Sequence, residues 1–106
     1  MRRQIGAIIA REEAFLLRFA PGSPQHSLLR NRIAALNTVL QLIDGEERPD
    51  REALAFALPR IGSMLHKMKT ARNKYEPGSR NYRRFDPGVQ LMEAAQSLLL
   101  RAMEDI

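Results

Sequence analysis

The chain has 106 residues, with 17 Lys or Arg against 12 Asp or Glu, which gives a formal charge of +5. This length supports one domain, because two separate cores would each be too small to fold well. The sequence has no Cys, which excludes disulfides, thiolate metal sites and cysteine nucleophiles. With 44% hydrophobic and 27% charged residues, the composition is typical of a folded domain.

The first half of the chain predicts two helices joined by a turn. The first spans about residues 3–19 and ends before Pro21-Gly22. Ser23 is placed to cap the second helix, with Pro24 at its first position, where a missing N–H costs nothing. This helix runs to about residue 43, where Gly45 provides a left-handed end.

The second half predicts two more helices. Asp50 caps a third helix with an apolar seam, formed by Leu54, Ala57, Ile61, Met64, Met68, Ala71 and Tyr75. Pro59 removes one backbone hydrogen bond, so we expect a kink or break near Leu58. Asp86-Pro87 predicts the start of a fourth helix, whose apolar stripe is Val89, Met92, Ala95, Leu99, Ala102 and Ile106. Residues 79–85 fit either a loop or one or two helical turns.

These elements predict an all-α fold, an antiparallel up-and-down four-helix bundle in a single domain of residues 1–106. One αα-hairpin comprises about residues 1–45 and the other about residues 50–106. The apolar run near the amino terminus stops after six residues at Arg11, short of the roughly 7–15 that a signal peptide needs. No run approaches the ~18 apolar residues of a membrane span. We therefore expect a cytoplasmic protein that does not enter a membrane.

Shifting the sequence by 56 residues reveals an internal similarity. Over residues 3–23, five of 21 positions are identical to residues 59–79, including Pro21-Gly22-Ser23 and Pro77-Gly78-Ser79. One interpretation is a duplication that yields two hairpins about a pseudo-twofold axis. The other is chance, because Pro-Gly-Ser commonly ends a helix and apolar heptads match easily.

Glu12 is the one carboxylate in the apolar stripe of the first helix. A carboxylate pointing inward there is a ligand or acid–base group, is paired with an arginine such as Arg32, or reaches water. Neither His26 nor His66 follows a Glu by three residues, so the ligands of a di-metal bundle are missing. The glycines form no nucleotide-binding motif. We therefore predict no metal, no cofactor and no enzymatic activity.

The positive charge is concentrated in residues 66–84. This segment has seven Lys or Arg against one Glu, a net of +6, and the rest of the chain sums to about −1. The predicted contacts for an anion or nucleic acid are Lys67, Lys69, Arg72, Lys74, Arg80, Tyr82, Arg83 and Arg84. Basic residues with interleaved aromatics suit single-stranded nucleic acid, and they equally suit an acidic protein. A solvated basic face without a ligand is the third interpretation.

Two functions follow from these features. The leading one is a helical module that binds a protein partner or forms a homo-oligomer, since Leu16, Leu17, Leu98, Leu100 and Met103 exceed what one core face needs. The alternative is a nucleic-acid-binding protein that uses the 66–84 segment.

Overall fold

A computed structural model describes residues 1–45 and 47–105. In these residues all regular secondary structure is helical: α1 (Arg2–Leu16), α2 (Pro24–Asp44), α3 (Arg51–Arg72) and α4 (Arg80–Glu104). The all-α prediction with four helices is confirmed. Ile106, which we placed in the last apolar stripe, lies outside the described residues.

Most helix ends form as the sequence predicts. The Ser23 hydroxyl accepts a hydrogen bond from the His26 backbone N–H at 3.2 Å, and Pro24 is the first residue of α2. The Asp50 carboxylate accepts one from the Ala53 N–H at 2.8 Å. Gly45 ends α2 with a φ of +69°, a conformation in which a side chain is unfavourable.

Two helix boundaries differ from the prediction: α1 ends at Leu16 and not near residue 19, and α4 begins earlier than expected. α4 begins at Arg80, not at Asp86-Pro87, because the Ser79 hydroxyl caps it by accepting from the Tyr82 N–H at 3.2 Å. Pro87 therefore lies inside the helix, and residues 80–85 are helical. α3 continues through Pro59, so no break occurs near Leu58, and the kink stays a prediction.

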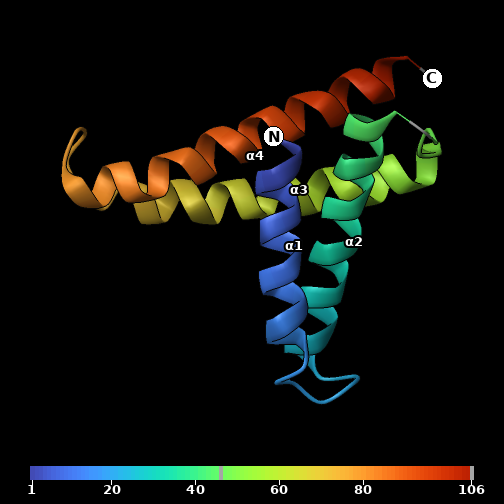
Figure 1. The fold of residues 1–106 in the computed structure, drawn as a ribbon, viewed down its shortest axis with the longest axis horizontal. Helices are drawn as coiled ribbons and strands as arrows, with labels where there is room; N and C mark the ends of the chain where they lie inside the picture. Colours follow the sequence, from blue (N-terminus) through green and yellow to red (C-terminus); the bar gives the residue numbers. More distant parts are fainter. Residues whose placement is uncertain (46, 106) are drawn as a thin grey trace.

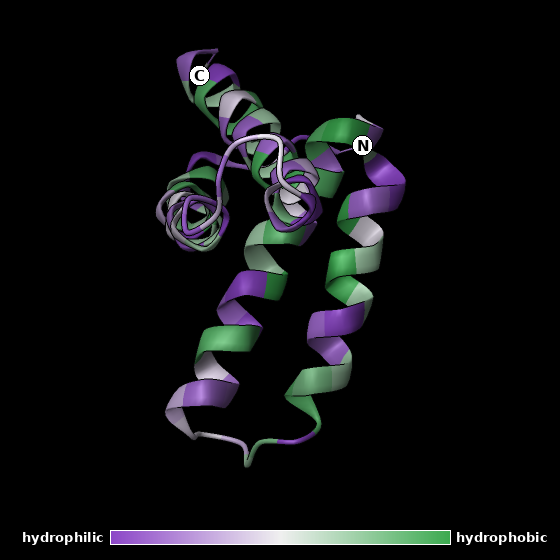
Figure 2. Cartoon of the chain, turned by 90° about the vertical axis from the view of Figure 1, so that its left-hand side faces the viewer, coloured by the Kyte–Doolittle hydropathy of each residue, from purple (hydrophilic) through white to green (hydrophobic). Residues whose placement is uncertain are grey.

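The four helices form two hairpins that cross each other (Figure 1). Hairpin 1 consists of α1 and α2, and hairpin 2 consists of α3 and α4. Figure 2, turned by 90°, shows hairpin 1 projecting away from hairpin 2. The predicted up-and-down arrangement, with four helices alongside one another, is therefore not confirmed. α2 joins the two halves because it packs on both α3 and α4.

The hydrophobic core lies where the hairpins meet, and all four helices contribute to it. Its fully buried side chains include Ile5, Leu36, Val39, Leu54, Ile61, Val89, Met92 and Leu99. Beyond this region each hairpin has a free end (Figure 1). We call residues 14–28 the free end of hairpin 1 and residues 68–85 the free end of hairpin 2.

The turns at the two free ends have the same backbone geometry. α1 and α3 end 56 residues apart, and α2 and α4 begin 56 residues apart. Gly22 has a φ of +86° and Gly78 a φ of +84°. Ser23 and Ser79 each accept a hydrogen bond from the backbone N–H three residues later, at 3.2 Å in both cases. This common geometry supports the duplication hypothesis, which stays a prediction.

Candidate functional site

The basic segment lies around the free end of hairpin 2. Residues 66–84 form the last turns of α3, the connecting turn and the first turn of α4, at the left of Figure 1. Because α4 begins at Arg80, the arginines Arg80, Arg83 and Arg84 project from a helix and not from a loop. The segment therefore forms one positively charged end of the molecule.

Two of the eight predicted contact residues instead stabilise this end internally. Arg72 Nη1 donates to Asp86 Oδ1 at 2.8 Å, and the Arg72 side chain is only 16% exposed. The Arg72 guanidinium also lies 5.0 Å from the centroid of the Tyr82 ring, a cation–π contact. These contacts occupy the Arg72 side chain and one face of the Tyr82 ring.

The other six predicted residues keep their charge available. Within residues 1–45 and 47–105, no carboxylate lies within 4.0 Å of the charged groups of Lys67, Lys69, Lys74, Arg80, Arg83 and Arg84. Five of these residues are exposed, and Lys69 is half-buried. This end of the molecule is thus an uncompensated cluster of cations that attracts anions.

The aromatic rings of this end also pack internally. Tyr75 and Phe85 stack with their ring centroids 6.0 Å apart and their planes 7° from parallel. The Arg84 guanidinium lies 6.0 Å from the Phe85 centroid. This aromatic pair joins the turn after α3 to the first turns of α4, so it contributes to packing as well as to the surface.

Glu12 is half-buried, because the second half of α1 extends away from hairpin 2 (Figure 1). No Lys, Arg or His group in the described part of the chain lies within 4.0 Å of its carboxylate, so Arg32 does not pair with it. The Glu12 carboxylate is therefore tolerated in the apolar stripe of α1 because it stays partly exposed to water.

The histidines and acids do not gather into a metal site. No group of three or more His, Asp or Glu in the described residues is arranged to hold an ion. His66 is exposed, whereas His26 is half-buried near the start of α2. Among the described helices, none is long and apolar enough to cross a membrane.

The most exposed apolar side chains gather at the free end of hairpin 1. Leu17 is 88% exposed, and Phe15 and Leu28 are 42% and 46% exposed. On α4 the predicted excess is smaller, because Leu98 and Met103 are half-buried against the core and only Leu100 is exposed. The apolar surface thus lies mainly on hairpin 1.

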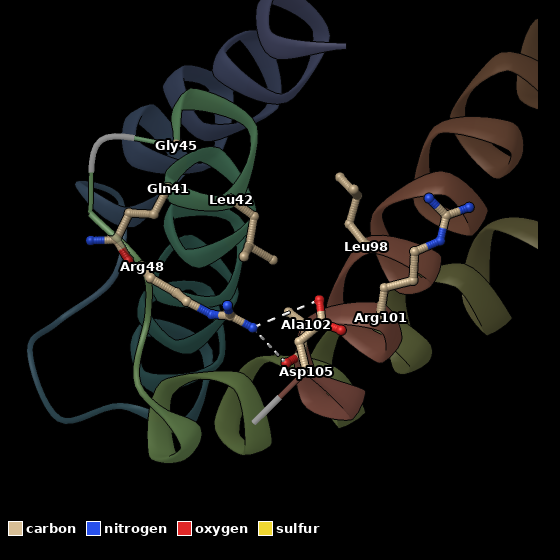
Figure 3. Close-up of a pocket in the computed structure, with 8 residues that line it drawn as sticks. All are labelled: Gln41, Leu42, Gly45, Arg48, Leu98, Arg101, Ala102 and Asp105. Atoms are coloured by element: carbon tan, nitrogen blue, oxygen red, sulfur yellow. Dashed lines mark hydrogen bonds and ion pairs between the residues drawn. The ribbon is translucent and has the colours of Figure 1, made fainter.

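A hollow of about 340 Å³ lies beside the segment that connects the hairpins (Figure 3). Arg48 extends across this hollow (Figure 3) and donates from Nη2 to the Ala102 carbonyl at 3.3 Å, with the Asp105 carboxylate 3.9 Å away. A cation at the C-terminal end of α4 is favoured by the helix dipole. These contacts tie the connection to α4, which is a structural role.

A larger groove, of about 680 Å³, lies between α1 and hairpin 2. It brings Lys67 and Arg84 of the basic segment next to Arg11 of α1. Arg11 is not among the predicted contact residues, although the shift by 56 residues aligns it with Lys67.

Comparisons with protein-family models, curated proteins and solved structures find no match for this chain. Function must therefore be inferred from these surfaces.

Proposed function

We propose that the protein is a non-enzymatic, cytoplasmic interaction module, which associates with another protein through the free end of hairpin 1. The observation that carries the proposal is the 88% exposure of Leu17, directly after α1, with Phe15 exposed in the last turn of that helix. Removing apolar surface from water is favourable by roughly 25 cal/mol of free energy per Å². The simplest partner is a second copy, which brings the same surface and packs on it about a twofold axis. The absence of Cys fits a cytoplasmic location.

Replacing Leu17 with Glu tests this proposal. A carboxylate at the centre of an apolar contact would lose its water without a partner, so we expect Leu17→Glu to be a monomer. The parent protein should show a mass that rises with concentration in multi-angle light scattering. The matched variant is Leu100→Glu, at a 46% exposed leucine on α4, which should still associate. A parent protein that stays monomeric at every concentration contradicts association with a second copy.

The second candidate function is nucleic-acid binding by the basic segment, residues 66–84, around the free end of hairpin 2. Six cations without a neighbouring carboxylate support it, since phosphate contacts with Lys and Arg release counterions and dominate such affinities.

Fluorescence anisotropy with labelled single- and double-stranded oligonucleotides tests this second function. We expect binding at low salt that weakens steeply as salt rises, and its loss in a triple variant with Arg80, Arg83 and Arg84 changed to Ser. The control variant removes the same charge elsewhere, by changing the exposed residues Arg3, Arg30 and Arg51 to Ser. If neither oligonucleotide binds the parent protein at low salt, the second function is wrong.

A further inference from the structure

The groove between α1 and hairpin 2 combines an apolar floor with a basic rim. The floor includes Ile8 of α1, Met68 of α3 and Leu91 of α4. Ile8 is buried, and Met68 and Leu91 are half-buried. Three helices thus present apolar side chains to one open space, where Ile8 of the core and the two side chains packed against the core line its floor.

Three cations from three different helices surround this floor: Arg11 of α1, Lys67 of α3 and Arg84 of α4. All three are exposed. In the part of the chain that the structure describes, no carboxylate lies within 4.0 Å of any of them. The groove therefore favours a ligand that is apolar on one side and negatively charged at its edges.

The groove has a larger volume than the space that the 56-residue shift makes equivalent to it. A smaller hollow, of about 290 Å³, lies between α2 and α3 and is lined by six residues. Shifted by 56 positions, five of them fall on residues of the groove: Leu28 on Arg84, Asn31 on Pro87, Arg32 on Gly88, Arg60 on Gln4 and Ser63 on Ala7. The two spaces are thus equivalent under this shift, although one lies between α1 and hairpin 2 and the other between α2 and α3.

The matching places differ in how closely their helices approach. In the smaller hollow α3 packs on α2, whereas α1 and α4, the matching pair, barely touch. Gly88 and Ala7 stand on the groove where the smaller hollow has Arg32 and Ser63. The sparse packing of α1 on α4, with Gly88 where the smaller hollow has an arginine, therefore accompanies the larger volume of the groove.

We propose that this groove binds an acidic amphipathic helix of a partner protein. Half of the twelve lining residues are exposed, so the groove does not enclose a ligand as small-molecule sites do. An open groove suits a helix, whose apolar residues at positions i, i+3 or i+4 and i+7 contact the floor. Carboxylates beside that apolar stripe would pair with the three cations. A second copy is disfavoured, because this chain has a net charge of +5.

This inference rests on the proposed function, since it also makes the protein an interaction module, but it uses another surface. The probe is a fluorescein-labelled synthetic helix of about 16 residues, roughly 24 Å long, with Leu at positions i, i+4 and i+7 and Glu beside them. We expect the full chain to bind this peptide. A peptide of the same composition in scrambled order should bind at least about tenfold more weakly.

Ala7→Glu tests the position of the site, because Ala7 is an exposed residue of α1 that lines the groove. We expect this variant to weaken peptide binding at least about tenfold, by filling the groove and repelling the peptide carboxylates. The matched control is Ala34→Glu, which makes the same charge change at an exposed alanine within α2. This control should bind like the parent protein, and circular dichroism should show that both variants remain helical.

The Leu17→Glu variant separates this inference from the proposed function. It should bind the peptide with unchanged affinity, and Ala7→Glu should still associate with itself. Equal binding of the ordered and scrambled peptides, or an equal effect of Ala7→Glu and Ala34→Glu, would overturn the groove proposal. A competition experiment could also overturn it. If a single-stranded oligonucleotide displaced the peptide, and Ala7→Glu weakened binding of that oligonucleotide, the groove would recognise nucleic acid.

Discussion

At the scale of single residues, the pairing of Arg72 with Asp86 most changes the interpretation of the basic segment. The sequence presents Arg72 as one of seven similar cations. The structure places its guanidinium 2.8 Å from a carboxylate fourteen positions away and next to the Tyr82 ring. No local pattern selects which cation finds this partner, because the choice depends on how α3 and α4 lie against each other.

We expect the Arg72→Gln substitution to reduce stability. It removes a mostly buried, charge-assisted hydrogen bond and leaves Asp86 with fewer donors, at a cost of about 1–3 kcal/mol in the free energy of unfolding. Urea denaturation followed by circular dichroism measures this difference. Lys74→Gln, at an exposed lysine two positions later, should change the free energy of unfolding by less than about 0.5 kcal/mol. Equal effects of the two substitutions would show that the ion pair does not stabilise the fold.

At the scale of elements, the helix ends followed rules that operate within a few residues. The caps at Ser23 and Asp50 and the left-handed Gly45 were predicted because each depends only on its own neighbourhood. The start of α4 was misplaced because two signals compete there. Asp86-Pro87 resembles a cap followed by proline, yet Ser79 caps the helix earlier, and Asp86 pairs with Arg72 instead.

The matching turns yield a paired prediction. Gly22 and Gly78 have φ values of +86° and +84°, so an added side chain strains both backbones equally, by about 1–2 kcal/mol each. We expect Gly22→Ala and Gly78→Ala to lower the thermal midpoint by similar amounts. Gly6→Ala is the control, since Gly6 lies inside α1 with open space around it and Ala favours a helix by about 1 kcal/mol. A neutral result at either turn would mean that this turn has another conformation in solution.

At the scale of the whole molecule, the crossing of the hairpins decides which predicted residues are exposed. A bundle with four parallel axes would cover the full length of each apolar stripe. Because the hairpins cross, they cover each other only near their crossing, and Phe15 and Leu28 stay exposed on hairpin 1. The same arrangement leaves Glu12 half-buried and places Tyr75 at an exposed end.

The crossing also separates two kinds of surface. One free end is apolar around Leu17, and the other is basic around Arg80 and Arg83, although their turns have the same backbone geometry. The groove forms between them because α1 approaches hairpin 2 without packing closely on α4. The proposed self-association uses the apolar free end, whereas the proposed helix binding uses the groove, whose floor includes the core residue Ile8.

The sequence by itself determined the helical content, most caps and most of the core residues. For example, Ile61 and Leu99 were placed correctly because helical periodicity and capping depend on residues within one or two turns. Only the tertiary structure decided the crossing, the Arg72–Asp86 pair and the meeting of Arg11 with Lys67 and Arg84. The physical reason is that helix crossing depends on how side chains far apart in the chain interdigitate, and no local pattern encodes that geometry.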